Sequence, residues 1–128
     1  MSCGFKRISL VCVPTADQDR AVAFYEQLGF EKRTDQPFGG GSRWIEVYLP
    51  GTPTGIALTP PPPGQEITPV VTGITLTTAD IVETHAALKA RGVDVDAEVM
   101  RVGGPVPPLF WFRDPSGHTL MVVEQRES

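Results

Sequence analysis

The residues with the most chemical potential lie in one alternating stretch, where Glu46 stands two positions from Trp44 and two from Tyr48. Side chains two positions apart on a strand point to the same face, so we expect this carboxylate between two aromatic rings. A carboxylate there can bind a cationic group, act as a general base, or form a structural ion pair with Arg43 or Arg113. The spacing predicts the shared face and leaves these roles open.

A second group of candidates lies near the end of the chain, where Trp111 and Arg113 are two positions apart and Met121 belongs to the next apolar run. Aromatic rings hold planar or cationic ligands by stacking and cation–π contact, and an arginine can neutralise an anion. The predicted ligand-binding side chains are Trp44, Glu46, Tyr48, Trp111, Arg113, Cys12 and Met121. Glu46 is the candidate catalytic group, and Phe38 is a further aromatic residue near this set.

Histidine and cysteine give weaker signals. His118 follows a turn and is expected to be solvated, while His85 is expected to be half-buried on a helix. Two isolated histidines without acidic ligands at metal spacing do not predict a metal site. Cys12 is expected to be a buried, inert thiol. Together with Cys3 it cannot form a disulfide framework, which suits a reducing compartment.

Composition sets limits on the elements that position these side chains. Hydrophobic residues make up 41% and charged residues 20% of 128 residues, a globular balance that excludes a largely disordered chain. Gly and Pro number 13 each, which predicts a turn-rich fold of short elements. The net charge of −4 argues against a nucleic-acid partner, and no run approaches the roughly 20 apolar residues of a membrane span. We therefore expect a cytoplasmic protein without a nucleic-acid or membrane partner.

The pattern of apolar residues predicts the same order of elements twice: a strand, a helix and three strands. In the first half the expected strands are 8–13, 30–34, 43–49 and 55–59, with a helix over 19–28 and a loop over 37–42. In the second half the expected strands are 70–77, 93–99, 109–113 and 119–124, with a helix over 81–91.

An internal repeat supports this division. Thr15-Ala-Asp17 recurs as Thr78-Ala-Asp80, 63 residues later, and Gly29 recurs as Gly92 at the same offset. Four consecutive prolines between the halves favour an extended polyproline connector. We predict an α+β fold of two βαβββ modules that form a curved, cup-like mixed sheet. The chain is then one domain, with module one at about 5–59, the connector at 60–69 and module two at about 70–126.

Period-two alternation assigns the faces of these strands. The side chains expected toward the helices are Ile45, Val47, Ile56, Leu58, Phe110, Phe112, Leu120 and Val122. The opposite, concave face is expected to carry Trp44, Glu46, Tyr48, Ala57, Leu109, Trp111, Arg113 and Met121, joined by Leu10 and Cys12 if Val11 and Val13 face the helix, and by Gly73, Thr75 and Thr77 if Ile74 and Leu76 do. A concave face with these groups is the predicted ligand pocket.

Two stretches resemble a known family. Residues 15–30, TADQDRAVAFYEQLGF, resemble the first module of the vicinal oxygen chelate superfamily, and residues 112–118, FRDPSGH, resemble its second-module turn. That family includes glyoxalase I, bleomycin- and fosfomycin-resistance proteins, methylmalonyl-CoA epimerase and extradiol dioxygenases. The chain is similar in pattern to glyoxalase-like bacterial proteins from about Phe5 to Glu124. The resemblance implies the βαβββ fold and a homodimer, and it leaves the chemistry open.

The family's enzymes usually hold one divalent metal with four side chains, and the resemblance maps those positions onto Leu10, Ala57, Gly73 and Met121. Three of these side chains offer no donor, and the Met121 thioether suits softer metals. We therefore expect no metal and no cofactor. Metal-free relatives bind bulky ligands on the same concave face, which makes binding of a small aromatic or cationic molecule the leading hypothesis.

Two alternatives stay open. One is a lyase or isomerase of the same superfamily, either metal-free with Glu46 as base or with a metal site placed elsewhere. The other is a dimerising subunit without a ligand of its own.

Overall fold

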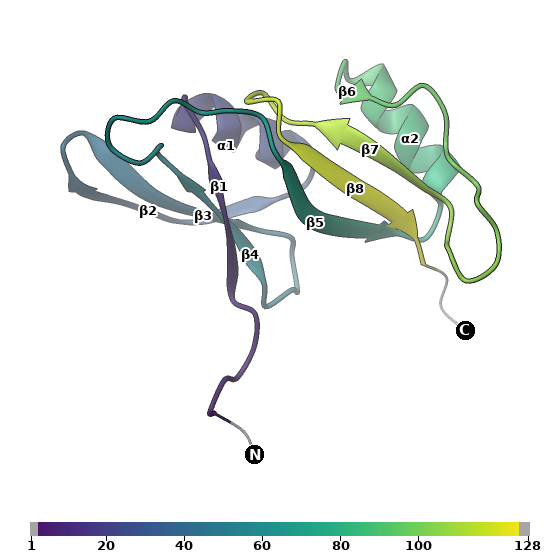
Figure 1. Cartoon of the computed structure of the whole chain (residues 1–128), viewed down its shortest axis with the longest axis horizontal. Coiled ribbons are helices and arrows are strands. Elements are labelled where there is room, and N and C mark those ends of the chain that lie inside the picture. Colours follow the sequence, from purple (N-terminus) through teal and green to yellow (C-terminus); the bar gives the residue numbers. More distant parts are fainter. Residues whose placement is uncertain (1–2, 126–128) are drawn as a thin grey trace. The chain divides into compact units, whose positions relative to one another are not determined.

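The computed structural model describes residues 3–125, apart from the side chain of Phe38. The chain divides into two compact units, Met1–Ile67 (unit 1) and Thr68–Ser128 (unit 2). Figure 1 shows that each unit is a sheet with one helix. The fold class is confirmed: the two units are similar modules of mixed four-stranded sheet, and neither sheet closes on itself.

Unit 1 begins with an edge strand and returns to pair with it. Its elements are β1 (Leu10–Pro14), α1 (Gln18–Gln27), β2 (Glu31–Gly39), β3 (Ser42–Tyr48) and β4 (Gly55–Thr59). The strand order is β1-β4-β3-β2, with β1 parallel to β4 and the other pairs antiparallel. The Gln18 amide donates hydrogen bonds to the carbonyls of Arg43 and Leu58, which ties the start of α1 to β3 and β4.

Unit 2 repeats this topology. Its elements are β5 (Val71–Thr78), α2 (Ile81–Ala90), β6 (Asp94–Val95), β7 (Leu109–Arg113) and β8 (Thr119–Glu124). The order is β5-β8-β7-β6, again with the first strand parallel to its neighbour. The start of α2 is tied to β8, because the Glu124 carboxylate accepts a hydrogen bond from the Ile81 N–H.

The repeated sequence motifs set the ends of the two helices. Asp17 and Asp80 are the N-caps, and their carboxylates accept hydrogen bonds from the backbone N–H groups three residues later. Gly29 and Gly92 follow the helix ends with φ of 106° and 77°, a left-handed conformation that glycine adopts without steric cost. The sequence prediction of both helix ends is confirmed to within one residue.

The core of each unit lies between its helix and its sheet. All eight residues that were predicted to face the helices are at most 4% exposed: Ile45, Val47, Ile56, Leu58, Phe110, Phe112, Leu120 and Val122. Tyr25 on α1 is fully buried and packs edge-on against Phe24 and Phe30. The alternation in sequence therefore assigned the buried face of both sheets correctly.

Two strand predictions were wrong. β2 extends to Gly39 instead of ending at residue 34, because its register with β3 continues through Pro37 and leaves only Gly40 and Gly41 as the hairpin tip. β6 has two residues instead of the predicted 93–99, because the chain leaves the edge of the sheet after Val95. Among residues 3–125, no helix is long and apolar enough to cross a membrane.

Candidate functional site

The open face of each sheet, opposite its helix, carries the candidate residues. On unit 1 the Glu46 carboxylate lies between its two aromatic neighbours and is bonded to both. Oε2 accepts a hydrogen bond of 2.7 Å from Trp44 Nε1, and Oε1 accepts one of 2.7 Å from the Tyr48 hydroxyl. Trp44, Glu46 and Tyr48 (the Glu46 cluster) are each half-buried. The predicted shared face is therefore confirmed, and Glu46 does not pair with Arg43, which bonds Asp35 and Asp19 instead.

Tyr48 is held in this cluster from two sides. Its ring lies over the start of β4, where a Cβ on Gly55 would come within 2.6 Å of the ring. The Arg33 guanidinium lies 4.7 Å from the ring centroid, within the range of a cation–π contact. The hydrogen bond to Glu46 raises the pKa of Tyr48 above its ordinary 10.0, with burial as the second cause. Only a glycine at position 55 allows this placement of the ring.

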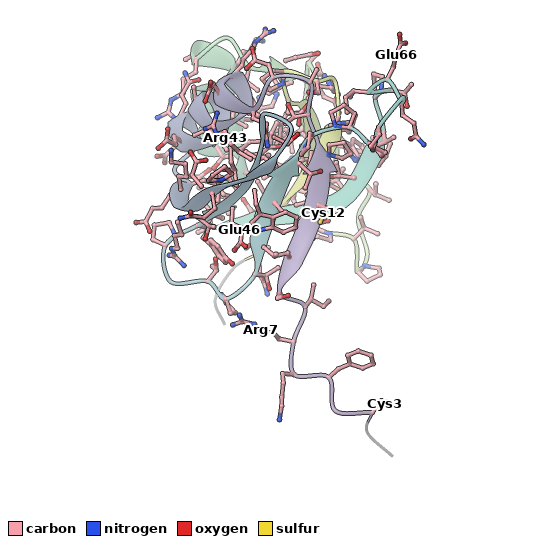
Figure 2. The ribbon with its side chains drawn as sticks, turned by 90° about the vertical axis from the view of Figure 1, so that its left-hand side faces the viewer. Cys3, Arg7, Cys12, Arg43, Glu46 and Glu66 are labelled. Atoms are coloured by element: carbon pink, nitrogen blue, oxygen red, sulfur yellow. The ribbon has the colours of Figure 1, made fainter. Side chains whose placement is uncertain are left out.

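The register places Cys12 and Ala57 in one row with Glu46 across β1, β4 and β3. Ala57 is buried between these neighbours, whereas Cys12 is exposed. The expectation of a buried Cys12 was wrong, because β1 is an edge strand and its open face has no neighbour beyond it in the sheet. In Figure 2, Arg43 lies by α1, while Glu46 and Cys12 lie away from that helix.

Unit 2 carries a hollow on its open face, with a volume of about 110 Å³. The residues that line this hollow come from β5, β7 and β8: Val71, Gly73, Ile74, Thr75, Trp111, Thr119 and Met121. None of these side chains is charged. The hollow brings together two predicted ligand-binding residues, Trp111 and Met121.

The four positions that the family resemblance assigned to a metal divide between the units. Leu10 and Ala57 lie on neighbouring strands of unit 1, and Gly73 and Met121 both line the hollow of unit 2. Within the described part of the chain, no group of three or more His, Cys, Asp or Glu side chains is arranged to hold a metal ion.

Arg113, the candidate for anion binding, and Arg43, the candidate partner of Glu46, are each engaged with carboxylates of their own units. Arg43 bonds Asp35 through Nε and Nη2 and bonds Asp19 through Nη1, all within 2.9 Å. The Arg43 guanidinium, together with the Lys32 ammonium, holds the pKa of Asp35 well below its ordinary value.

Arg113 on β7 has the same type of arrangement. Its guanidinium bonds Asp96 at 2.8 Å and Asp94 at 2.9 Å, and these bonds raise the pKa of Arg113. The Asp96 carboxylate also accepts a hydrogen bond from the backbone N–H of Trp111, so the Arg113–Asp96 ion pair fixes the backbone beside the hollow.

His118 corrects a prediction, because it is 1% exposed instead of solvated. Its ring Nδ1 accepts a hydrogen bond of 3.1 Å from the Val70 backbone N–H, and the His118 backbone N–H donates to the Asp114 carboxylate. The turn before β8 therefore folds under the chain that enters β5, and Pro69 lies close to Gly117. His85 is half-buried on α2 as predicted; its Nε2 bonds the Asp96 carbonyl, and its ring packs edge-on against Phe110.

Sequence reasoning missed several residues that shape these faces. Arg33 and Gly55 around Tyr48 gave no signal in the sequence that predicts this contact. Ile74 in the wall of the hollow and Thr72 beside it were missed because strict alternation was assumed along β5, and Thr119 was missed although alternation along β8 places it on the same face as Met121. A glycine inside an apolar strand pattern, here Gly73 with φ of 76°, is a known indication of a bulge and was the available signal.

Comparison with known proteins agrees with the fold and its repeat. The family described as "Glyoxalase/Bleomycin resistance protein/Dioxygenase superfamily" matches residues 7–122. The chain belongs to this superfamily. No match was found among curated proteins.

Several solved structures are similar over nearly the whole chain. The crystal structure of TnmS3, an antibiotic binding protein from Streptomyces sp. CB03234, is 30% identical with a TM-score of 0.80, and the match covers 96% of this chain and 98% of TnmS3. A superfamily member from Sphaerobacter thermophilus DSM 20745 is 32% identical with a TM-score of 0.83, with coverage of 94% and 98%. A glyoxalase/bleomycin resistance protein from Streptomyces sp. CB03234 is 33% identical with a TM-score of 0.70, with coverage of 89% and 96%.

Proposed function

We propose that this chain binds a small planar molecule without transforming it, and that an uncharged aromatic part of the ligand enters the hollow of unit 2. The observation that carries this proposal is the hollow itself, which has Trp111 and Met121 in its wall and no charged side chain. A cavity of about 150 Å³ holds benzene, so a hollow of about 110 Å³ that is open to solvent suits one ring of a planar ligand, with the rest of the ligand outside the hollow. Trp111 then supplies stacking or edge-on contact.

The character of the hollow selects against ions. An ionised group that leaves water for a site without a charged partner loses its hydration at a large cost in free energy. The arginine nearest in sequence, Arg113, is engaged by Asp94 and Asp96 and is not among the lining residues. The hollow is therefore proposed to prefer a neutral ring over a charged ring of the same size.

A cationic group of a ligand has a different place on this chain. The Glu46 carboxylate is held on the open face of unit 1 by Trp44 and Tyr48, each of which occupies one oxygen. A carboxylate oxygen has capacity for more than one hydrogen bond, so the Glu46 cluster can still accept a bond from an ammonium group. We propose that this cluster is the cation-binding surface.

One relative supports the proposal. TnmS3 is described as an antibiotic binding protein and is 30% identical over 96% of this chain. The proposal transfers only binding of a small molecule and not the identity of the antibiotic.

The experiment uses three probes that share one ring system and differ in charge: 2-naphthol, 2-naphthoate and 1-naphthylmethylammonium. Each is titrated into the full chain by calorimetry, together with the Trp111→Ala and Trp44→Ala variants. The expected result is that 2-naphthol binds more tightly than 2-naphthoate, and that Trp111→Ala weakens 2-naphthol about tenfold. Trp44→Ala is the matched control and is expected to leave 2-naphthol unchanged. Absence of binding by all three probes, or equal affinity in Trp111→Ala, would overturn the proposal.

We also propose a homodimer, which the family resemblance implied. β1 and β5 are edge strands of their own sheets, and edge strands are the parts of a sheet that can pair with another chain. Light scattering is expected to give twice the chain mass of 13.9 kDa. A monomer at high protein concentration would contradict this.

A further inference from the structure

The first strands of the two repeats differ in one respect. β1 pairs with β4 in unbroken register from Leu10 to Pro14. β5 pairs with β8 with a shift between Val71 and Thr75, so that four steps along β5 match two steps along β8. β5 therefore contains a bulge, and a bulge re-aims side chains and often stands next to a functional site.

The Thr72 hydroxyl occupies the centre of this bulge. It donates a hydrogen bond of 2.9 Å to the Thr119 carbonyl on β8. It also accepts one of 3.1 Å from the Ile74 N–H. One side chain thus bonds two backbone groups in the interval where the register of the two strands is interrupted. Gly73 between them has φ of 76°, which a residue with a side chain adopts only under strain.

The bulge and the hollow occupy the same place. Four of the seven lining residues are the consecutive or nearly consecutive β5 residues Val71, Gly73, Ile74 and Thr75, and Thr119 is a fifth. In a regular strand, the side chains of neighbouring residues point to opposite faces. The register shift and the lining residues Gly73, Ile74 and Thr75 therefore fall in the same stretch of β5.

We propose that Thr72 is a positioning residue that holds the β5 bulge open and thereby forms the hollow for the ligand ring. Thr72 is not itself among the lining residues, so it acts through Gly73, Ile74 and Thr119. This inference rests on the proposed function for its ligand, and on the two hydrogen bonds for its mechanism. The hydroxyl is the required group, and the methyl group of threonine is not.

The test compares Thr72→Val, which keeps the shape and removes the hydroxyl, with Thr72→Ser, which keeps the hydroxyl. Thr77→Val is the matched control, because it makes the same chemical change on β5 beyond the bulge. Each variant is measured for amide hydrogen exchange at Ile74, for affinity for 2-naphthol and for thermal stability. A positioning role predicts that Thr72→Val exchanges the Ile74 amide about fivefold faster and binds 2-naphthol about fivefold more weakly. Thr72→Ser and Thr77→Val are expected to match the parent chain in both.

The outcomes separate this inference from the proposed function. If the parent chain binds no naphthalene probe, the proposed function fails, and the Ile74 amide alone decides whether Thr72 holds the bulge. Unchanged exchange at Ile74 in Thr72→Val overturns the inference whatever the ligand does. Faster exchange with unchanged 2-naphthol affinity also overturns it, because the bulge bond would then not form the hollow. If Thr72→Val does not fold, Thr72→Ser decides: Ile74 amide exchange or 2-naphthol affinity that differs from that of the parent chain overturns the inference.

Discussion

A row of three residues at equivalent positions crosses the open face of each unit, but the residues at these positions differ. In unit 1 the row is Cys12, Ala57 and Glu46, and in unit 2 it is Thr75, Met121 and Trp111. The repeat offset of 63 residues relates Cys12 to Thr75, so the two rows are structural equivalents. One topology therefore presents a carboxylate on the open face of unit 1 and a large aromatic ring on the open face of unit 2.

The consequences for the surface follow from the neighbours of each row. In unit 1 the polar atoms satisfy one another, since Trp44 and Tyr48 donate to Glu46, and the Tyr48 ring covers Gly55. In unit 2 the β5 bulge leaves a hollow beside Trp111 and Met121. The comparison teaches that repeated backbones acquire different chemistry through a few side chains and one change of register.

The largest expected effect concerns the filled face of unit 1. Gly55→Ala places a Cβ 2.6 Å from the Tyr48 ring, so the ring must move and its hydrogen bond to Glu46 is lost. We expect the free energy of unfolding to fall by about 1–3 kcal/mol, as for overpacked sites. Denaturant unfolding checks this.

A double-mutant cycle provides the control for that prediction. In a Tyr48→Ala background the added Cβ of Gly55→Ala meets no ring, so its cost is expected to disappear. An equal cost in both backgrounds would show that the contact between the ring and position 55 is not the cause.

Gly73, which lines the hollow, is expected to respond to the same substitution for a different reason. At Gly73 a Cβ would have no atom within 4 Å, but φ is 76°. Gly73→Ala is therefore expected to lower the free energy of unfolding by about 1–2 kcal/mol through backbone strain alone. Thermal or denaturant unfolding measures it, and a Tyr48→Ala background should leave this cost unchanged. A cost near zero would contradict the left-handed bulge.

A smaller effect is expected from the ion pairs, and it depends on pH. The folded-state pKa of Asp35 lies below its ordinary 3.8, chiefly because of the Arg43 guanidinium, so the unfolded chain binds more protons in acid. The stabilisation is present above the unfolded pKa and is lost as the pH falls through the folded pKa. Asp35→Asn should therefore lower Tm at pH 6 and have a diminishing effect below about pH 4. A difference in Tm that stays constant down to pH 2 would contradict the lowered pKa.

The smallest effect is on Tyr48 itself. Because the hydrogen bond to Glu46 raises the pKa of the Tyr48 hydroxyl, Glu46→Gln should return that pKa toward 10.0. Ultraviolet titration of tyrosinate formation is suited to this, since the chain has two tyrosines and Tyr25 is fully buried. Arg33→Gln is the control, because Arg33 lowers the pKa only as a minor cause. An unchanged Tyr48 pKa in Glu46→Gln would contradict the hydrogen bond between Tyr48 and Glu46 as the cause of the raised pKa.

Much of the fold was available from the sequence because it depends on local patterns. The caps at Asp17 and Asp80 and the glycines at 29 and 92 are recognised by residue type alone. Alternation assigned Ile45 and Phe112 to the buried faces because a strand has a fixed period of two. The grouping of Trp44, Glu46 and Tyr48 follows from the same rule.

The rest depends on contacts between segments that are distant in sequence. The β5 bulge arises from pairing with β8, so a period-two pattern could not place Ile74 and Thr75 on the same hollow. His118 is buried because the chain entering β5 covers it, and Arg43 finds Asp35 and Asp19 instead of Glu46 because those carboxylates lie beside it in the fold. Which partner a polar side chain takes is decided by tertiary structure.

If the two open faces differ in what they bind, the two tryptophans report on them separately, because Trp44 lies on unit 1 and Trp111 on unit 2. The indole N–H signals of Trp44 and Trp111 are followed by two-dimensional NMR while 2-naphthol is added to the full chain, with Trp44→Phe and Trp111→Phe to assign each signal. We expect 2-naphthol to shift the indole N–H signal of Trp111 and to leave in place that of Trp44, whose indole N–H is bonded to Glu46. A shift confined to Trp44, or no shift of Trp111 at saturating probe, would contradict this expectation.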